Sequence, residues 1–145
     1  MKKNLIVIQG IPGSGKGYLA RQLLKKDKSK ETIIVNRDDI RSMLGDYWVP
    51  KREGLVTRIE LNMIQEGLRS GYDVIVDATN LNPRTIKNLK FIATSEGVAI
   101  MFKPIRVSIK KAFLQMVYRV IKGGRQIPYK VIKGFYNRYK DTIGV

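Results

Sequence analysis

The segment Gly10–Gly17 has the residue types and spacing of a phosphate-binding loop, because it follows an apolar run and opens a helical pattern. Glycines let backbone N–H groups curl around phosphate oxygens, and the following helix N-terminus adds a favourable partial charge. A plain glycine-rich turn is the alternative, but the context favours a nucleoside triphosphate, and ATP is the expected ligand. The predicted nucleotide-binding residues are Gly10, Pro12, Gly13, Ser14, Gly15, Lys16 and Gly17.

The metal site is the least orthodox part of this loop. Gly17 stands where a serine or threonine hydroxyl ordinarily ligates Mg²⁺. We expect weaker or more adaptable Mg²⁺ binding rather than its loss, because triphosphate oxygens and waters supply most of the ligands. Asp77 ends an apolar strand, where an acid commonly orients metal-bound water, so it is the candidate metal residue. An ordinary capping role for Asp77 is the alternative.

A candidate general base follows the second apolar run, in the segment Asn36–Arg41. The chain has no histidine, so a carboxylate must accept the proton of an attacking hydroxyl, and Asp38 is the natural candidate. Asp39 fits a helix N-cap, and a capping role for both acids is the alternative. We expect Asp38→Asn to lower turnover by orders of magnitude and to spare ATP binding.

The C-terminal third contains a candidate lid. Residues 97–140 include 11 basic residues and no acid, and Arg119, Lys122 and Arg125 surround two glycines. Such a loop could close over the triphosphate and place positive charge on the transferring group. A flexible helix connection with solvated charges is the alternative. Four tyrosines are candidates for base stacking, although packing is more common at helical spacing: Tyr118, Tyr129, Tyr136 and Tyr139.

These candidates need a scaffold, which the hydrophobic pattern predicts. Short apolar runs predict strands at 4–9, 32–36, 72–77 and 98–103. Helical spacing predicts helices at about 14–26, 37–44, 51–69, 83–95, 108–121 and 128–139. Continuous apolar strands that alternate with helices imply a parallel sheet covered on both faces. The predicted fold is therefore α/β, a three-layer sandwich of the P-loop NTPase type with about four to five strands and a basic C-terminal lid.

Charge and composition narrow the partners and the chemistry. The chain carries 28 Lys and Arg against 12 Asp and Glu, a net charge of +16, which favours a polyanion partner over a generally basic surface. The lack of cysteine excludes disulfides, thiolate metal sites and cysteine nucleophiles. With 145 residues, 43% apolar content and no long apolar run, we expect one domain over 1–145 and no membrane segment. No secretory signal is apparent, so we expect a cytoplasmic location, in the host if a phage encodes the protein.

These motifs together resemble the phage polynucleotide 5′-kinases. The resemblance rests on residues 10–16, 36–41, 77–83 and 119–128, which have the order and spacing of that family over most of the chain. It implies a kinase that uses Mg²⁺ and transfers the γ-phosphate of ATP to the 5′-hydroxyl of DNA or RNA. Many relatives add a phosphatase domain, for which we expect no counterpart in these residues.

The resemblance also implies roles for single residues. Lys16 would bind phosphate, Asp38 would be the base, and Arg41 would hold the acceptor phosphate next to the reacting hydroxyl. Other positions that match the acceptor side of the family are Arg37, Thr79 and Asn80. An arginine of the lid would contact the phosphate donor, ATP, and Arg125 is the candidate for this catalytic arginine. The lid departs from the usual Arg-Asn followed by a second Arg, so the choice among Arg119, Lys122 and Arg125 stays open.

Other functions stay open at this point. The acceptor could be the hydroxymethyl group of a modified base such as 5-hydroxymethyluracil in phage DNA, which would need flipping from a duplex. A small-metabolite kinase has the same fold but little need for a charge of +16. A non-catalytic, nucleotide-gated nucleic-acid binder would explain Gly17, and it conflicts with the presence of Asp38, Arg41 and Asp77. The sequence leaves the choice of DNA or RNA and the oligomeric state open.

Overall fold

In the computed structural model, which describes residues 3–123 and 127–143, four strands form one parallel sheet in the order β2-β3-β1-β4. The strands are β1 (Asn4–Gln9), β2 (Thr32–Asn36), β3 (Asp73–Asp77) and β4 (Ala99–Pro104). The parallel register places Asn36 beside Asp77 and Ile8 beside Asp77, so the carboxyl ends of three strands meet at one edge. The predicted parallel sheet is confirmed, with four strands.

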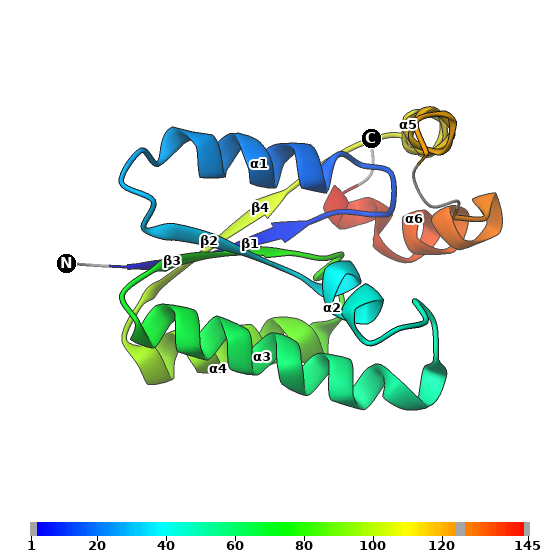
Figure 1. Cartoon of the computed structure of the whole chain (residues 1–145). Coiled ribbons are helices and arrows are strands. Elements are labelled where there is room, and N and C mark those ends of the chain that lie inside the picture. Colours follow the sequence, from blue (N-terminus) through cyan, green and yellow to red (C-terminus); the bar gives the residue numbers. More distant parts are fainter. Residues whose placement is uncertain (1–2, 124–126, 144–145) are drawn as a thin grey trace.

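Helices cover both faces of the sheet. They are α1 (Lys16–Lys26), α2 (Arg37–Met43), α3 (Glu53–Arg69), α4 (Pro83–Glu96), α5 (Ile109–Ile121) and α6 (Tyr129–Ile143), with a 3₁₀ turn at Pro50–Arg52. Figure 1 shows α1 on one face and α3 with α4 on the other. The short α2 and the α5–α6 pair lie at the end of the sheet to which the strands point (Figure 1). That end is therefore where a site on this fold is built.

The core explains why the strands are apolar throughout. Alternate residues of the central strands face opposite helix layers: Val74 and Val76 pack toward α3 and α4, whereas Ile75 packs with Ile8 and Ala20 of α1. Fully burying such a side chain contributes about 1.5–3 kcal/mol, so both faces stabilise the sheet. A further apolar cluster joins the connection regions to the lid helices through Ile11, Leu81, Val107, Ala112, Met116 and Ile132.

Several predicted boundaries shift for local reasons. Asn36 is the N-cap of α2, because its side-chain oxygen accepts a hydrogen bond from the Asp39 N–H at 3.0 Å. The prediction that Asp38 or Asp39 caps this helix was therefore wrong; both lie in its first turn. Pro50 begins a 3₁₀ turn, so α3 starts at Glu53 rather than at 51. In the residues that the structure describes, no helix has the length and apolar content to cross a membrane.

Candidate functional site

The phosphate loop connects β1 to α1 at the carboxyl end of the sheet. The Gly10 N–H donates to the Thr79 carbonyl at 3.1 Å, which ties the loop to the turn after β3. Gly15 is the N-cap of α1 and has no side chain that could cap the helix, so backbone N–H groups of the first turn remain free to bind an anion. The Ser14 hydroxyl is buried and makes no hydrogen bond within the described part of the chain, which suits a ligand oxygen.

Gly13 brings the loop into contact with the lid. Its φ is +84°, a conformation that side chains rarely adopt. A Cβ at this position would lie only 2.2 Å from the Ala112 carbonyl oxygen in α5. Next to it, the side chain of Ile11 is buried with Ala112 and Met116. The first turn of α5 therefore rests directly on the phosphate loop.

Lys16 and Asp77 form the charged centre of the site. The Lys16 ammonium lies over the loop and donates to the Ile11 carbonyl at 3.1 Å. Burial lowers the pKa of Lys16 to about 8, against the opposing charges of Asp77 and Asp38. Burial raises the pKa of Asp77, and the Lys16 charge and a 2.9 Å hydrogen bond from the Asn36 amide oppose that rise. One ammonium and two carboxylates thus influence one another at this edge.

The residues around Gly17 fit a magnesium ion held mainly by the nucleotide. A Cβ at Gly17 would lie 3.8 Å from Asp77 Oδ2, so a hydroxyl at that position would face the same carboxylate. Among residues 3–123 and 127–140, no group of three or more His, Cys, Asp or Glu side chains could hold a metal. Mg²⁺ usually binds through one or two carboxylates plus substrate phosphates and waters. Asp77 fits such a carboxylate, and its metal role stays a prediction.

Asp38 belongs to a hydrogen-bonded network that joins α2 to α3. Its Oδ1 accepts hydrogen bonds from Arg41 Nη1 at 2.8 Å and from the Tyr47 hydroxyl at 2.7 Å. Arg41 also donates from Nε and Nη2 to the two carboxylate oxygens of Glu53, at 3.0 and 2.7 Å. The hydrogen bond with Arg41 lowers the pKa of Glu53. The candidate base is thus half-exposed and fixed on one side by Arg41 and Tyr47.

The structure places Arg37 against α3. Its guanidinium donates to the Thr57 hydroxyl at 3.0 Å and pairs with Glu60 at 3.2 Å and Glu53 at 3.3 Å. Burial raises the pKa of Glu60, and the Arg37 charge opposes that rise. These contacts anchor α2 on α3, and the acceptor-binding role of Arg37 stays a prediction.

Asn80 and Thr79 hold the turn after β3. Asn80 has a φ of +51°, and its buried amide donates to the carbonyls of Ile8 at 2.7 Å and Val76 at 3.1 Å. The Gln9 amide donates to the Asn80 carbonyl at 3.0 Å. These bonds explain why an asparagine suits a left-handed turn position here. A substrate contact for Thr79 and Asn80 stays a prediction.

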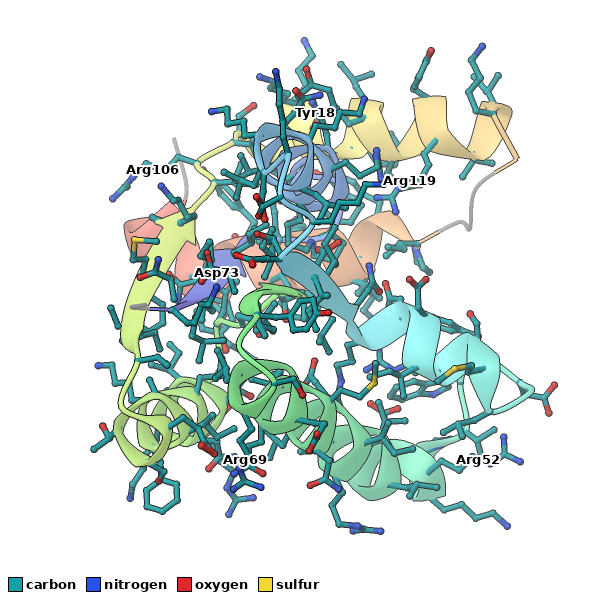
Figure 2. All side chains as sticks on the ribbon, turned by 60° about the vertical axis from the view of Figure 1, so that its left-hand side comes forward. Tyr18, Arg52, Arg69, Asp73, Arg106 and Arg119 are labelled. Carbon is teal, nitrogen blue, oxygen red and sulfur yellow. The ribbon has the colours of Figure 1, made fainter. Side chains whose placement is uncertain are left out.

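The described lid residues occupy different positions. Arg119 is exposed on α5, and its positive charge adds to the effect of burial, which lowers the pKa of Lys16 in the phosphate loop. Figure 2 shows Arg119 on the side of α5 near α1. The Lys122 ammonium lies 5.6 Å from the ring of Tyr118. Arg125 lies outside the described residues, and the donor roles of all three stay predictions.

The aromatic residues of the lid mostly pack. Tyr129 meets Phe113 edge-on with ring centroids 5.0 Å apart, and Tyr139 stacks on Phe135 at 6.5 Å. Tyr136 also lies against the apolar cluster of the lid. Tyr136 and Tyr139 thus pack as in the packing alternative, whereas Tyr129 is 45% and Tyr118 is 63% exposed, and base stacking by these two stays a prediction.

Three residues that surround Arg41 were not predicted from the sequence to belong to the site. Tyr47 and Trp48 place their rings 5.5 and 5.6 Å from the Arg41 guanidinium carbon, and Glu53 binds the same guanidinium. The available signal was an aromatic pair in the short connection after α2. Nothing local in the sequence indicates that these rings return to Arg41.

Comparison with known proteins supports a kinase domain. A family described as an AAA domain matches residues 5–117. An L-seryl-tRNA(Sec) kinase from Methanococcus maripaludis is 30% identical over 146 residues, covering 97% of this chain and 53% of the relative. A protein of Autographa californica nuclear polyhedrosis virus, described as a bifunctional polynucleotide kinase/RNA ligase, is 27% identical over 125 residues, or 76% of this chain and 17% of the viral protein.

The solved structures give a close structural match. A chain of the Pnkp1/Rnl/Hen1 RNA repair complex has a TM-score of 0.86 and 26% identity, covering 97% of this chain and 45% of that one. This chain therefore spans about half the length of the first relative and less of the others. The resemblance to polynucleotide kinases is confirmed, whereas a phage origin, DNA binding and Mg²⁺ stay predictions. Since the family match covers most of the chain and the fold is an ATP-binding one, the protein belongs to the AAA domain family as a P-loop kinase domain.

Proposed function

We propose that this domain transfers the γ-phosphate of ATP to a hydroxyl of a nucleic acid, in the first place the 5′-hydroxyl of a strand end. The supporting observation is the convergence of Lys16, Asp38 and Asp77. The charges of both acids act on the Lys16 ammonium, so the phosphate-binding lysine and the candidate base share one site. The half-exposed Asp38 carboxylate is accessible to an incoming hydroxyl.

The chemistry follows from these positions. Asp38 accepts the proton of the acceptor hydroxyl, whose oxygen forms a bond to the γ-phosphorus. The bond between the γ-phosphorus and the β–γ bridging oxygen breaks, and ADP leaves. Lys16 and Arg119 offset the negative charge of the phosphates. A bound Mg²⁺, held by Asp77 through water, would neutralise further phosphate charge.

Charge and relatives support a nucleic-acid acceptor. A net charge of +16 attracts a polyanion, and a small-metabolite acceptor would leave this excess without a role. The relatives reported above are described as a tRNA kinase, a polynucleotide kinase/RNA ligase and an RNA repair complex. RNA is therefore the first acceptor to test. The network that fixes Asp38 argues against a binder that has lost turnover.

A second candidate acceptor is a hydroxyl carried by an aminoacyl group on tRNA. The seryl-tRNA kinase relative aligns with 97% of this chain, which favours this candidate over the remaining ones. A base hydroxymethyl group would use the same residues, but no contact in the described residues favours it.

The test is phosphate transfer from γ-labelled ATP with Mg²⁺ to parallel acceptors. These are RNA and DNA oligonucleotides with a 5′-hydroxyl, the same strands with a 5′-phosphate, seryl-tRNA, and an end-blocked duplex containing 5-hydroxymethyluracil. We expect label on the 5′-hydroxyl strands alone, and its loss in Asp38→Asn with ATP binding retained. Label on seryl-tRNA or on the modified duplex alone would refute the strand-end proposal. Salt-sensitive nucleic-acid binding without any label would favour the non-catalytic binder.

A further inference from the structure

An exposed indole stands beside Arg41, the residue whose guanidinium binds the candidate base Asp38. Trp48 lies in the connection between α2 and the 3₁₀ turn and is 59% exposed, although tryptophan is on average a highly buried residue. Exposure alone does not distinguish it, because Tyr18, Phe91 and Tyr118 are at least as exposed. Its position distinguishes it from these three aromatic residues.

Trp48 is linked to Asp38 through a single guanidinium. The Arg41 guanidinium carbon lies 5.6 Å from the Trp48 ring, and its Nη1 donates to Asp38 at 2.8 Å. On the same guanidinium, the Tyr47 ring lies at 5.5 Å, and the Tyr47 hydroxyl also donates to Asp38. An acceptor whose hydroxyl reaches Asp38 would therefore bring its neighbouring groups close to the indole.

The connection that carries Trp48 is fixed at both sides. The carboxylate of Glu53 holds Arg41 with two hydrogen bonds, which fixes the plane of the guanidinium. Arg52 donates to the Leu44 carbonyl at 2.8 Å and so closes the connection at its base. Figure 2 shows Arg52 beside the start of α3. The indole is thus presented on a braced connection, which lowers the entropy cost of stacking on it.

We propose that Trp48 stacks on the terminal nucleobase of the acceptor strand, next to the hydroxyl that Asp38 deprotonates. This inference rests on the proposed function, because it concerns the acceptor of the same reaction. A nucleobase is favoured over an apolar protein partner, since the indole lies against a guanidinium and the chain carries a charge of +16. Stacking tolerates any base, so Trp48 contributes acceptor affinity without sequence selectivity.

Fluorescence tests the contact directly, because Trp48 is the only tryptophan of the chain. We expect a 5′-hydroxyl oligonucleotide to quench its emission at concentrations that match acceptor binding. The same strand with an abasic first nucleotide should bind and quench much less. Equal quenching by the two strands would overturn the proposal, as would binding of the intact strand without a change in emission.

Kinetics provide the second test. Base stacking is worth about 1–3 kcal/mol, so Trp48→Ala should raise the acceptor KM about 5- to 150-fold and leave the ATP KM within about twofold. Trp48→Phe should recover most of the loss, and an abasic-end acceptor should show no difference between wild type and Trp48→Ala. Phe91→Ala, which removes a 69% exposed ring on α4, is the matched control. Thermal melting checks that each variant folds.

The outcomes separate the two proposals. If the wild type labels no nucleic acid, the proposed function fails. If the wild type labels 5′-hydroxyl strands and Trp48→Ala does so with an unchanged KM, only the stacking inference fails. An effect of Trp48→Ala on ATP binding alone, or quenching by a second copy of the chain, would assign the indole to another partner.

Discussion

Replacing Gly17 by serine restores the hydroxyl that phosphate loops ordinarily offer to the metal. The φ of Gly17 lies outside the left-handed region, so a side chain meets no backbone strain there. A new Cβ would lie 3.2 Å from a terminal nitrogen of Arg21, the end of a flexible side chain that can shift slightly. The same Cβ would lie 3.8 Å from Asp77 Oδ2, which places the hydroxyl beside the candidate metal carboxylate.

The change has two effects that a control variant separates. Removing a helical glycine stabilises α1 by about 1 kcal/mol for alanine and about half of that for serine. In a chain near this size, each kcal/mol of added stability raises the melting temperature by about 2–4 °C, so Gly17→Ala should raise it more than Gly17→Ser does. The metal effect has the opposite order, because only serine supplies an oxygen. Taking about 1 kcal/mol for that contact, Gly17→Ser should lower the Mg²⁺ midpoint about fivefold.

The assay is a Mg²⁺ titration of turnover, paired with calorimetric titration of Mg²⁺ into the ATP complex of each variant. Wild type and Gly17→Ala should share one midpoint, and Gly17→Ser should lie below both. Equal shifts in the serine and alanine variants would show that the midpoint follows helix stability and would refute the argument from the hydroxyl. An unchanged Mg²⁺ midpoint in both variants would show that a hydroxyl at position 17 does not coordinate the metal.

Three further predictions concern charge and backbone geometry. Because the pKa of Lys16 is about 8, its positive charge is present at neutral pH and is lost as the pH rises through about 8. Calorimetry should therefore show that the affinity for ATP falls up to about tenfold per pH unit above pH 8. Lys16→Met should abolish this pH dependence. Arg37→Ala leaves the buried Glu60 carboxylate without its partner and should lower the free energy of unfolding, measured in urea, by about 3–5 kcal/mol. Adding Glu60→Gln to this variant should recover part of the lost stability. A double variant no more stable than Arg37→Ala would contradict the pairing. Asn80→Ala loses buried hydrogen bonds and strains a left-handed residue, for about 2–3 kcal/mol in total, and Asn80→Gly should recover about 1 kcal/mol of that in thermal melts.

The fold was largely predictable because its signals are local. The runs at 4–9 and 73–77 are apolar on both faces, as strands in the middle of a covered parallel sheet must be. The helix predicted at 108–121 is α5, whose N-cap Ser108 accepts from the Lys111 N–H at 3.2 Å. The order of the strands was not predictable, since it depends on pairing between segments far apart in the sequence. The cap of α2 was missed because Asn36, Asp38 and Asp39 compete within one turn, and the end of β2 decides among them.

The site was predictable only where one motif contains it. The phosphate loop lies between β1 and α1 as its pattern requires, and Asp77 follows at the neighbouring strand end. The environment of Asp38 depends instead on how α2 packs on α3, which brings Glu53 and Tyr47 to Arg41. No spacing rule connects these residues, so their contribution to the candidate base appears only in three dimensions.

The contact between Gly13 and Ala112 limits how such domains can be recombined. Since a carbonyl of α5 occupies the volume that a Cβ at position 13 would need, any replacement of α5 must match the phosphate loop at this contact. A lid taken from another kinase would have to bring its own phosphate loop, or approach the loop from farther away. For the same reason, a displacement of the loop on nucleotide binding would push directly on the first turn of α5. The two segments are therefore mechanically coupled, although about a hundred residues separate them in the chain.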